Sequence, residues 1–194
     1  MQIPHPPIRI ATNSSDTFPL AGRLGYPMFS SLVVVPSPRF RQDIAVYWQT
    51  FEEAGHTRAG EEVALLFPLY VAETKAEAQT VPRQSIMHYF DVLSRRMVAG
   101  DADLDAATRE RNKKMQACLQ HLTFEEVREH VAIIGTPAHR IERIRCLQRE
   151  FHLSELICWF NPRGLIPHQT GLVSMSRFAA HICQISDEPV FRRI

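Results

Sequence analysis

Residues 63–71 read Val-Ala-Leu-Leu-Phe-Pro-Leu-Tyr-Val, a run without a single charged side chain. An apolar run of this length, with no alternation of polar residues, is typical of a strand that is buried on both faces of a parallel sheet. Pro68 has no N–H to donate to a neighbouring strand, so we expect a bulge or the end of the strand there. The run predicts an interior strand of a parallel sheet.

Three shorter apolar runs predict the neighbouring strands, at residues 8–12, 29–35 and 155–160. Apolar residues at helical spacing follow each of the four strands, and further helices are expected between the third strand and the fourth. The last helix is marked by Leu172, Met175, Phe178 and Ile182. Such alternation predicts an α/β fold whose four parallel strands pair in the order of the sequence.

The composition is that of an ordinary globular domain, with 45% hydrophobic residues, 22% charged residues and a net charge of +1 over 194 residues. A nucleic-acid or membrane partner is not expected, because neither clustered cationic residues nor an apolar run of about 18 residues is present. The N-terminus lacks the pattern of a signal peptide, so we expect a cytoplasmic protein. The four cysteines lack metal-ligand spacing and are expected to be buried free thiols, at Cys118, Cys146, Cys158 and Cys183.

Three stretches resemble one protein family, and they occur along nearly the whole chain. They are Ile10-Ala-Thr-Asn-Ser-Ser-Asp-Thr17 with Leu20-Ala-Gly-Arg-Leu-Gly25; Tyr70-Val-Ala-Glu-Thr-Lys-Ala-Glu-Ala78; and Ile134-Gly-Thr-Pro137 with Leu156-Ile-Cys-Trp-Phe-Asn161, Gly164-Leu-Ile-Pro-His168 and Ser174-Met-Ser-Arg-Phe-Ala179. Together they resemble the bacterial luciferase-like monooxygenases.

The resemblance implies a (β/α)8 TIM-barrel type of fold, of which this chain matches only the C-terminal four β/α units. We therefore expect a single partial-barrel domain over 1–194, a helical insertion at 79–132 before the last strand, and a tail at 186–194. The family's catalytic histidine lies in the first four units, so no catalytic residue is assigned here. An open half-barrel leaves strand edges unpaired, which predicts self-association or a partner chain.

The resemblance places the family's phosphate-binding Ser and Thr at Ser14 and Thr17. Asn13, Ser15 and the start of the following helix extend this candidate cofactor site, since hydroxyls and helix N-terminal N–H groups favour a phosphate dianion. The alternative is that Ser15 or Asp16 merely caps that helix. Arg163 stands where the family usually has glycine; it is a candidate contact for a phosphate or an acidic substrate, or else a solvated loop residue.

Two functions remain open on the sequence. The chain is either part of a flavin-dependent monooxygenase, in which reduced FMN and O2 oxidise an organic substrate, or a non-catalytic flavin-binding or interaction half-barrel that requires a partner. Whether the chain is an enzyme is thus undecided at this point. The deazaflavin F420 is the alternative cofactor, and no metal is expected. Trp159 and Phe160 are expected in the core.

Overall fold

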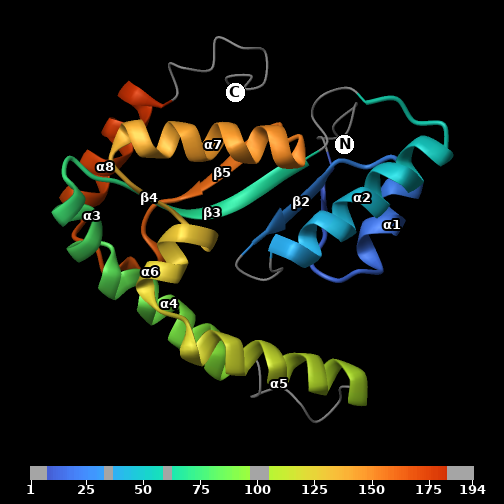
Figure 1. Ribbon diagram of the computed structural model, residues 1–194, viewed down its shortest axis with the longest axis horizontal. Helices are drawn as coiled ribbons and strands as arrows, with labels where there is room; N and C mark the ends of the chain where they lie inside the picture. Colours follow the sequence, from blue (N-terminus) through green and yellow to red (C-terminus); the bar gives the residue numbers. More distant parts are fainter. Residues whose placement is uncertain (1–7, 33–36, 59–62, 97–104, 183–194) are drawn as a thin grey trace, which may run out of the picture. The chain divides into compact units, whose positions relative to one another are not determined.

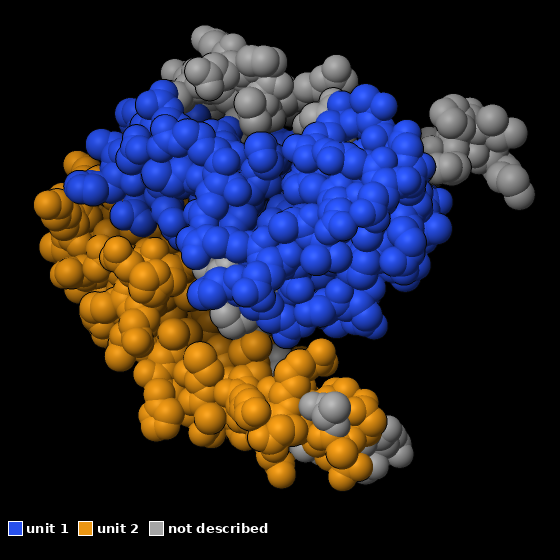
Figure 2. Space-filling model, turned by 45° about the vertical axis from the view of Figure 1, so that its right-hand side comes forward, with its two compact units in different colours: residues 1–67, 138–159, 179–194 blue, residues 68–137, 160–178 orange. Residues whose placement is uncertain are grey.

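The computed structural model describes residues 8–32, 37–58, 63–96 and 105–182. The chain divides into two compact units, with the first division between Phe67 and Pro68 (Figure 2). Unit 1 comprises residues 1–67, 138–159 and 179–194, and unit 2 comprises residues 68–137 and 160–178. Each unit therefore combines segments that are far apart in the sequence.

Strands and helices alternate along the chain. In unit 1 they are β1 (Ile10–Ala11), α1 (Thr17–Leu24), β2 (Met28–Ser31), α2 (Ser37–Glu53), the first part of β3 (Val63–Val71), α7 (Pro137–Phe151) and β5 (Glu155–Trp159). In unit 2 they are the rest of β3, α3 (Lys75–Thr80), α4 (Arg83–Arg96), α5 (Ala106–His121), α6 (Phe124–Glu126), the π-helical turn η2 (Val127–Val131), β4 (Ile133–Gly135), the short turn η3 (Pro162–Gly164) and α8 (His168–His181).

Parallel strands form the sheet of unit 1 (Figure 1). β1 pairs with β2, and β2 pairs with β3 in a register that places Met28 opposite Val63. β5 also pairs with β3, and the Ser154 N–H just before β5 donates to the Val63 carbonyl at 2.9 Å. The four predicted strands thus exist and their predicted neighbours are confirmed.

Helices α1 and α2 pack against each other in unit 1, side by side in Figure 1. They approach so closely at Gly22 that a Cβ atom there would lie 2.5 Å from the Tyr47 carbonyl oxygen. Aromatic side chains fill the core beneath them, with Phe40 in edge contact with both Phe18 and Phe151 at ring-centroid distances of 5.9 and 5.0 Å. The chain leaves α1 through Gly25, whose φ of 70° is the left-handed conformation predicted for a helix stop.

A buried polar network fastens unit 2. The hydroxyl of Tyr70, which is fully buried, donates to Glu77 Oε1 at 2.8 Å, and Arg177 Nη1 donates to the same oxygen at 2.8 Å. The Glu73 N–H donates to the other Glu77 oxygen at 2.8 Å. Burial acts to raise the pKa of Glu77, but these hydrogen bonds outweigh it and lower that pKa below its usual value. Glu77 is therefore an ionised carboxylate that joins β3, α3 and α8.

Helix α8 turns a small, polar face inward. Ser174 is fully buried, and its Oγ accepts a hydrogen bond from the Val71 N–H at 2.8 Å, while Gly171 is also buried. The large apolar side chains of this helix point elsewhere and are 40, 38 and 46% exposed at Leu172, Val173 and Met175. Of the apolar residues that marked this helix in the sequence, Leu172 and Met175 are exposed, Phe178 is half-buried, and Ile182, just past the end of α8, is buried.

Several other expectations need correction or fall outside the described residues. β3 does not end at Pro68, and a short strand not foreseen, β4, pairs with its second half from Leu69 opposite Ile133. Trp159 and Phe160 are only half-buried. The three cysteines in the described residues are free as expected but not buried: Cys118 is exposed, and Cys146 and Cys158 are partly exposed.

Residues 33–35 of the second expected strand, Cys183 and the expected tail at 186–194 lie outside the described residues. None of the helices in the described part of the chain combines the length and the apolar composition needed to cross a membrane.

Glu77→Gln is expected to lower the free energy of unfolding by about 1–3 kcal/mol at neutral pH, because charged hydrogen bonds to Arg177 and Tyr70 are lost. A carboxyl group with a lowered pKa stabilises the fold above its unfolded pKa, and that contribution is lost as the pH falls through the folded pKa. Urea unfolding at several acidic pH values should therefore show a smaller acid-dependent loss in the variant.

Glu73→Gln is the matched control, because the Glu73 side chain is 75% exposed where it pairs with Arg177. An exposed pair contributes little, so this variant should unfold within about 0.5 kcal/mol of the wild type. Equal losses in the two variants would contradict the role given to Glu77.

Candidate phosphate-binding loop

The first candidate site lies where β1 ends in unit 1. Thr12 is fully buried, and its N–H donates to the Phe29 carbonyl at 2.9 Å. The Ser30 hydroxyl donates to the Thr12 carbonyl at 2.7 Å, so both groups tie the end of β1 to β2. The following loop, residues 13–16, leads directly into α1. Ligands of α/β folds bind at this carboxyl end of the strands, which makes the loop a candidate site.

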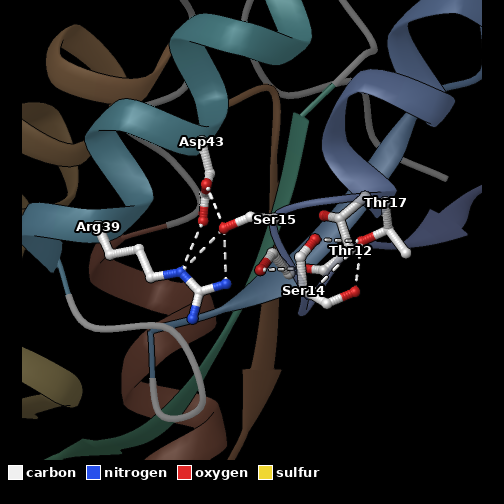
Figure 3. Close-up of polar contacts among 7 residues, drawn as sticks. Thr12, Ser14, Ser15, Thr17, Arg39 and Asp43 are labelled. Atoms are coloured by element: carbon white, nitrogen blue, oxygen red, sulfur yellow. Dashed lines mark hydrogen bonds and ion pairs between the residues drawn. The ribbon is translucent and has the colours of Figure 1, made fainter. Parts of the chain in front are cut away.

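Ser14 and Thr17 lie together in a tight turn at the start of α1 (Figure 3). The Thr17 hydroxyl donates to the Ser14 carbonyl at 2.7 Å, and the Thr17 N–H donates to the same carbonyl at 3.0 Å. The Ser14 hydroxyl is 3.4 Å from the Thr17 hydroxyl. Both side chains are half-buried, while Asn13 beside them is exposed. Two hydroxyls thus converge at a helix start, as the sequence predicts.

Ser15 points away from this pair, toward α2 (Figure 3). Its hydroxyl donates to Asp43 Oδ1 at 2.9 Å and accepts from Arg39 Nη2 at 2.7 Å. Asp16 occupies the N-cap position of α1 but makes no side-chain capping hydrogen bond. The alternative that Ser15 or Asp16 merely caps the helix is therefore wrong.

Sequence reasoning missed Arg39 and Asp43. Arg39 Nε donates to Asp43 Oδ2 at 3.1 Å, an ion pair spaced by four residues at the beginning of α2. The available signal was this i, i+4 pairing of opposite charges, which normally indicates a solvated helix face. Asp43, however, is only 8% exposed. The loop thus has a buried carboxylate and its guanidinium partner on one side and two hydroxyls on the other.

Arg163 belongs to unit 2, in the turn η3, and its side chain is exposed. Its φ of 71° is in the left-handed region, which a non-glycine residue adopts at a cost. Asn161 closes the turn through hydrogen bonds with Ile166 in both directions, at 2.8 and 3.0 Å, and accepts from Ser85 at 3.2 Å. Burial raises the pKa of Tyr89 on α4, while the positive charge of Arg163 acts to lower that pKa.

The structure therefore brings four of the five candidate residues into one loop of unit 1, at Asn13, Ser14, Ser15 and Thr17. Ser14 and Thr17 hold each other, Ser15 holds α2, and Asn13 is exposed. The Ser14 and Thr17 hydroxyls lie at the start of α1, where the Thr17 N–H already donates to the Ser14 carbonyl and Pro19 has no N–H. Two hydroxyls at a helix start, together with the helix dipole, form an arrangement suited to a phosphate dianion.

Solved structures with the same fold include two monooxygenases and a reductase. Monooxygenase RslO1 from Streptomyces bottropensis has 19% identity and a TM-score of 0.64, with 95% of this chain and 50% of that chain covered. The oxygenating constituent of 3,6-diketocamphane monooxygenase from Pseudomonas putida, in complex with FMN, has 17% identity and a TM-score of 0.63, with 91% and 47% covered.

The coenzyme F420-dependent tetrahydromethanopterin reductase from Methanopyrus kandleri has 13% identity and a TM-score of 0.58, with 92% and 50% covered. The chain thus spans about half the length of these structures. No curated protein matches it. The family model of the luciferase-like monooxygenases matches residues 1–151, more than three quarters of the chain. With an α/β fold and a parallel sheet of the kind found in these TIM-barrel proteins, the chain belongs to the luciferase-like monooxygenase family.

Proposed function

We propose that the chain binds the phosphate of FMN at the loop of residues 13–17 and serves a flavin-dependent monooxygenase reaction. The observation that carries the proposal is the convergence of the Ser14 and Thr17 hydroxyls at the start of α1. Membership of the family and the presence of FMN in the 3,6-diketocamphane monooxygenase structure support it.

The donor set of this loop fits a phosphate. Hydroxyl groups and backbone N–H groups at a helix start donate hydrogen bonds to anionic oxygens, and the helix dipole adds to the attraction. Among the described residues, the Ser14 and Thr17 side chains are not bonded to any carboxylate, because Asp43 is engaged by Ser15 and Arg39. When bound, reduced FMN supplies the electrons with which O2 oxidises an organic substrate. The residues of the loop anchor the cofactor at its phosphate end and fix its orientation.

F420 is the second candidate cofactor, because reductases and dehydrogenases that depend on it share this fold. The cytoplasm is the proposed location. Asn13, exposed beside the turn, is a further proposed contact to the phosphate. Arg163, exposed in unit 2, is proposed separately as a contact to an anionic group. For Arg163 the group is a phosphate or an acidic part of the substrate.

We also propose that the 194-residue chain associates with a second copy or with a complementary half-barrel chain. All five residues of β5 are partly exposed, whereas eight of the nine residues of β3 are buried. A strand of a parallel sheet is normally covered on both faces. The exposed apolar side chains of α8, Leu172 and Met175, offer further surface for a partner. A non-catalytic binding role is the alternative to an enzyme in such an assembly.

Ser14→Ala combined with Thr17→Ala is expected to weaken FMN binding by between about tenfold and a few hundredfold, because two hydrogen bonds to a charged group are lost. Riboflavin lacks the phosphate, so its affinity should be the same in the variant and the wild type. Fluorescence titration measures both. Equal FMN affinity in the two proteins would exclude the proposed phosphate contact.

Sedimentation of the chain at tens of micromolar should show species heavier than the 22.2 kDa monomer. Leu172→Glu combined with Met175→Glu should shift the distribution toward the monomer, because charged side chains oppose burial of this surface. Leu20→Glu with Leu24→Glu on α1, where the two leucines are 43 and 53% exposed, is the matched control and should leave the association unchanged. A stable wild-type monomer at these concentrations rules out association with a second copy.

Arg163→Gly separates the effect of the left-handed backbone conformation on stability from the effect of the side chain on ligand affinity. Glycine adopts a φ of 71° without the left-handed penalty, so the variant should be as stable as the wild type or up to about 1 kcal/mol more stable. Its affinity for FMN or for an anionic substrate should nevertheless fall about tenfold, while Arg163→Lys retains part of it. Unchanged affinity for both ligands would leave Arg163 as a solvated residue.

A further inference from the structure

Arg39 makes contacts with two partners at once beside the phosphate loop (Figure 3). Its Nε lies 3.1 Å from Asp43 Oδ2 and 3.2 Å from Ser15 Oγ, and its Nη2 lies 2.7 Å from Ser15 Oγ. Ser15 donates in turn to Asp43 Oδ1 at 2.9 Å. These three side chains form a closed triangle between the loop and α2, which we call the Arg39 triangle.

One member of the Arg39 triangle, Asp43, puts a negative charge close to the proposed phosphate site. Asp43 is 8% exposed, and its carboxylate touches the residue that directly follows Ser14. Since consecutive Cα atoms are about 3.8 Å apart, the carboxylate lies within roughly 10 Å of the Ser14 side chain. At such a distance, an unneutralised charge in a partly buried environment weakens the binding of an anion by on the order of tenfold or more. A phosphate dianion is thus opposed by Asp43 unless another group cancels its charge.

We propose that Arg39 is a positioning residue of the phosphate loop, which neutralises the charge of Asp43 beside the Ser14–Thr17 pair. This inference rests on the proposed binding of FMN phosphate at residues 13–17. Arg39 acts through Asp43 and does not itself contact the phosphate. A guanidinium suits the task, because its planar fork donates to both partners in one conformation.

A purely structural role would give a different pattern of effects. If the triangle only fastened the loop to α2, removal of either Arg39 or Asp43 would loosen the loop and weaken binding. Under charge neutralisation the two residues have opposite effects, because removal of the carboxylate removes the repulsion. Arg39→Ala should therefore be repaired by Asp43→Asn, and the deficit of the single variant should shrink as salt screens the unpaired charge.

The test compares FMN and riboflavin affinities of the full chain by fluorescence titration at low and high ionic strength. The variants are Arg39→Ala, Arg39→Lys, Asp43→Asn and the double variant Arg39→Ala with Asp43→Asn. Arg41→Ala is the matched control. Arg41 lies in the same helix turn as Arg39, pairs with Glu150, and has a side chain that is 57% exposed, so this variant removes the same charge from a solvated position. Thermal unfolding of each variant checks that it is folded.

Arg39→Ala is expected to weaken FMN binding about tenfold or more at low salt and less at high salt, with unchanged riboflavin affinity. Asp43→Asn should bind FMN at least as tightly as the wild type, the double variant should fall within about threefold of it, and Arg39→Lys should lie between wild type and Arg39→Ala. Arg41→Ala should match the wild type. If Arg39→Ala fails to fold, the Asp43→Asn and Arg39→Lys variants still distinguish the two roles. Asp43→Asn weakens FMN binding only if the triangle serves to attach the loop to α2.

The result that overturns the inference is a double variant as weak as Arg39→Ala, or an Asp43→Asn variant weaker than the wild type. Failure of the proposed function has a different signature. A wild-type chain that binds FMN no more tightly than riboflavin makes no use of the phosphate, and the proposed function then fails before any Arg39 variant is compared. If the wild type prefers FMN and Arg39→Ala retains that preference, only the inference about Arg39 fails.

Discussion

The hydrogen-bonded ladder of β3 is the constraint on which both units depend. Its first part pairs with β2 up to Leu66, and its last part pairs with β4 from Leu69 onward. Pro68 lies between the residues that pair with β2 and those that pair with β4, so its missing N–H removes no hydrogen bond from either pairing. A proline that would disrupt the middle of a continuous ladder is therefore tolerated in a buried strand. The same position marks the division of the chain into its two compact units.

The position of the candidate phosphate loop, residues 13–17, depends on this strand pairing. β2 is fixed by β3, the buried Thr12 is fixed by β2, and α1 is held against α2 by the close approach at Gly22. A loop between two such anchors has little freedom, so its hydroxyls are oriented before any ligand arrives. Pre-oriented donors reduce the entropy lost on binding, which favours the anion-binding role proposed for this short loop of small polar residues.

Much of the fold was predictable, because the burial of a strand and the residues that cap the ends of a helix are local properties of the sequence. The uniform apolar run of β3 predicts a buried strand, and that strand is confirmed. The helix stop at Gly25 and the capping box at Thr123 likewise have physical causes within a few residues. β4 was missed because three residues are too short for a periodic signal. The Arg39 triangle was missed for another reason: its Ser15 partner is 24 residues away, and only the tertiary fold brings the two together.

The inward face of α8 shows where sequence pattern and function diverge. Burial of Gly171 and Ser174, with Leu172 and Met175 exposed, reverses the usual order of an amphipathic helix. The Ser174 hydroxyl on this face accepts a hydrogen bond from the Val71 N–H of β3. The apolar side chains are then available to another surface, and the partly exposed β5 has the same character in the other unit. The phosphate binding proposed for residues 13–17 needs only one loop and the start of a helix. Oxidation of a substrate requires an enclosed space from which water is excluded. Phosphate binding and catalysis therefore make separate structural demands, and the described part of this chain has contacts suited to the first.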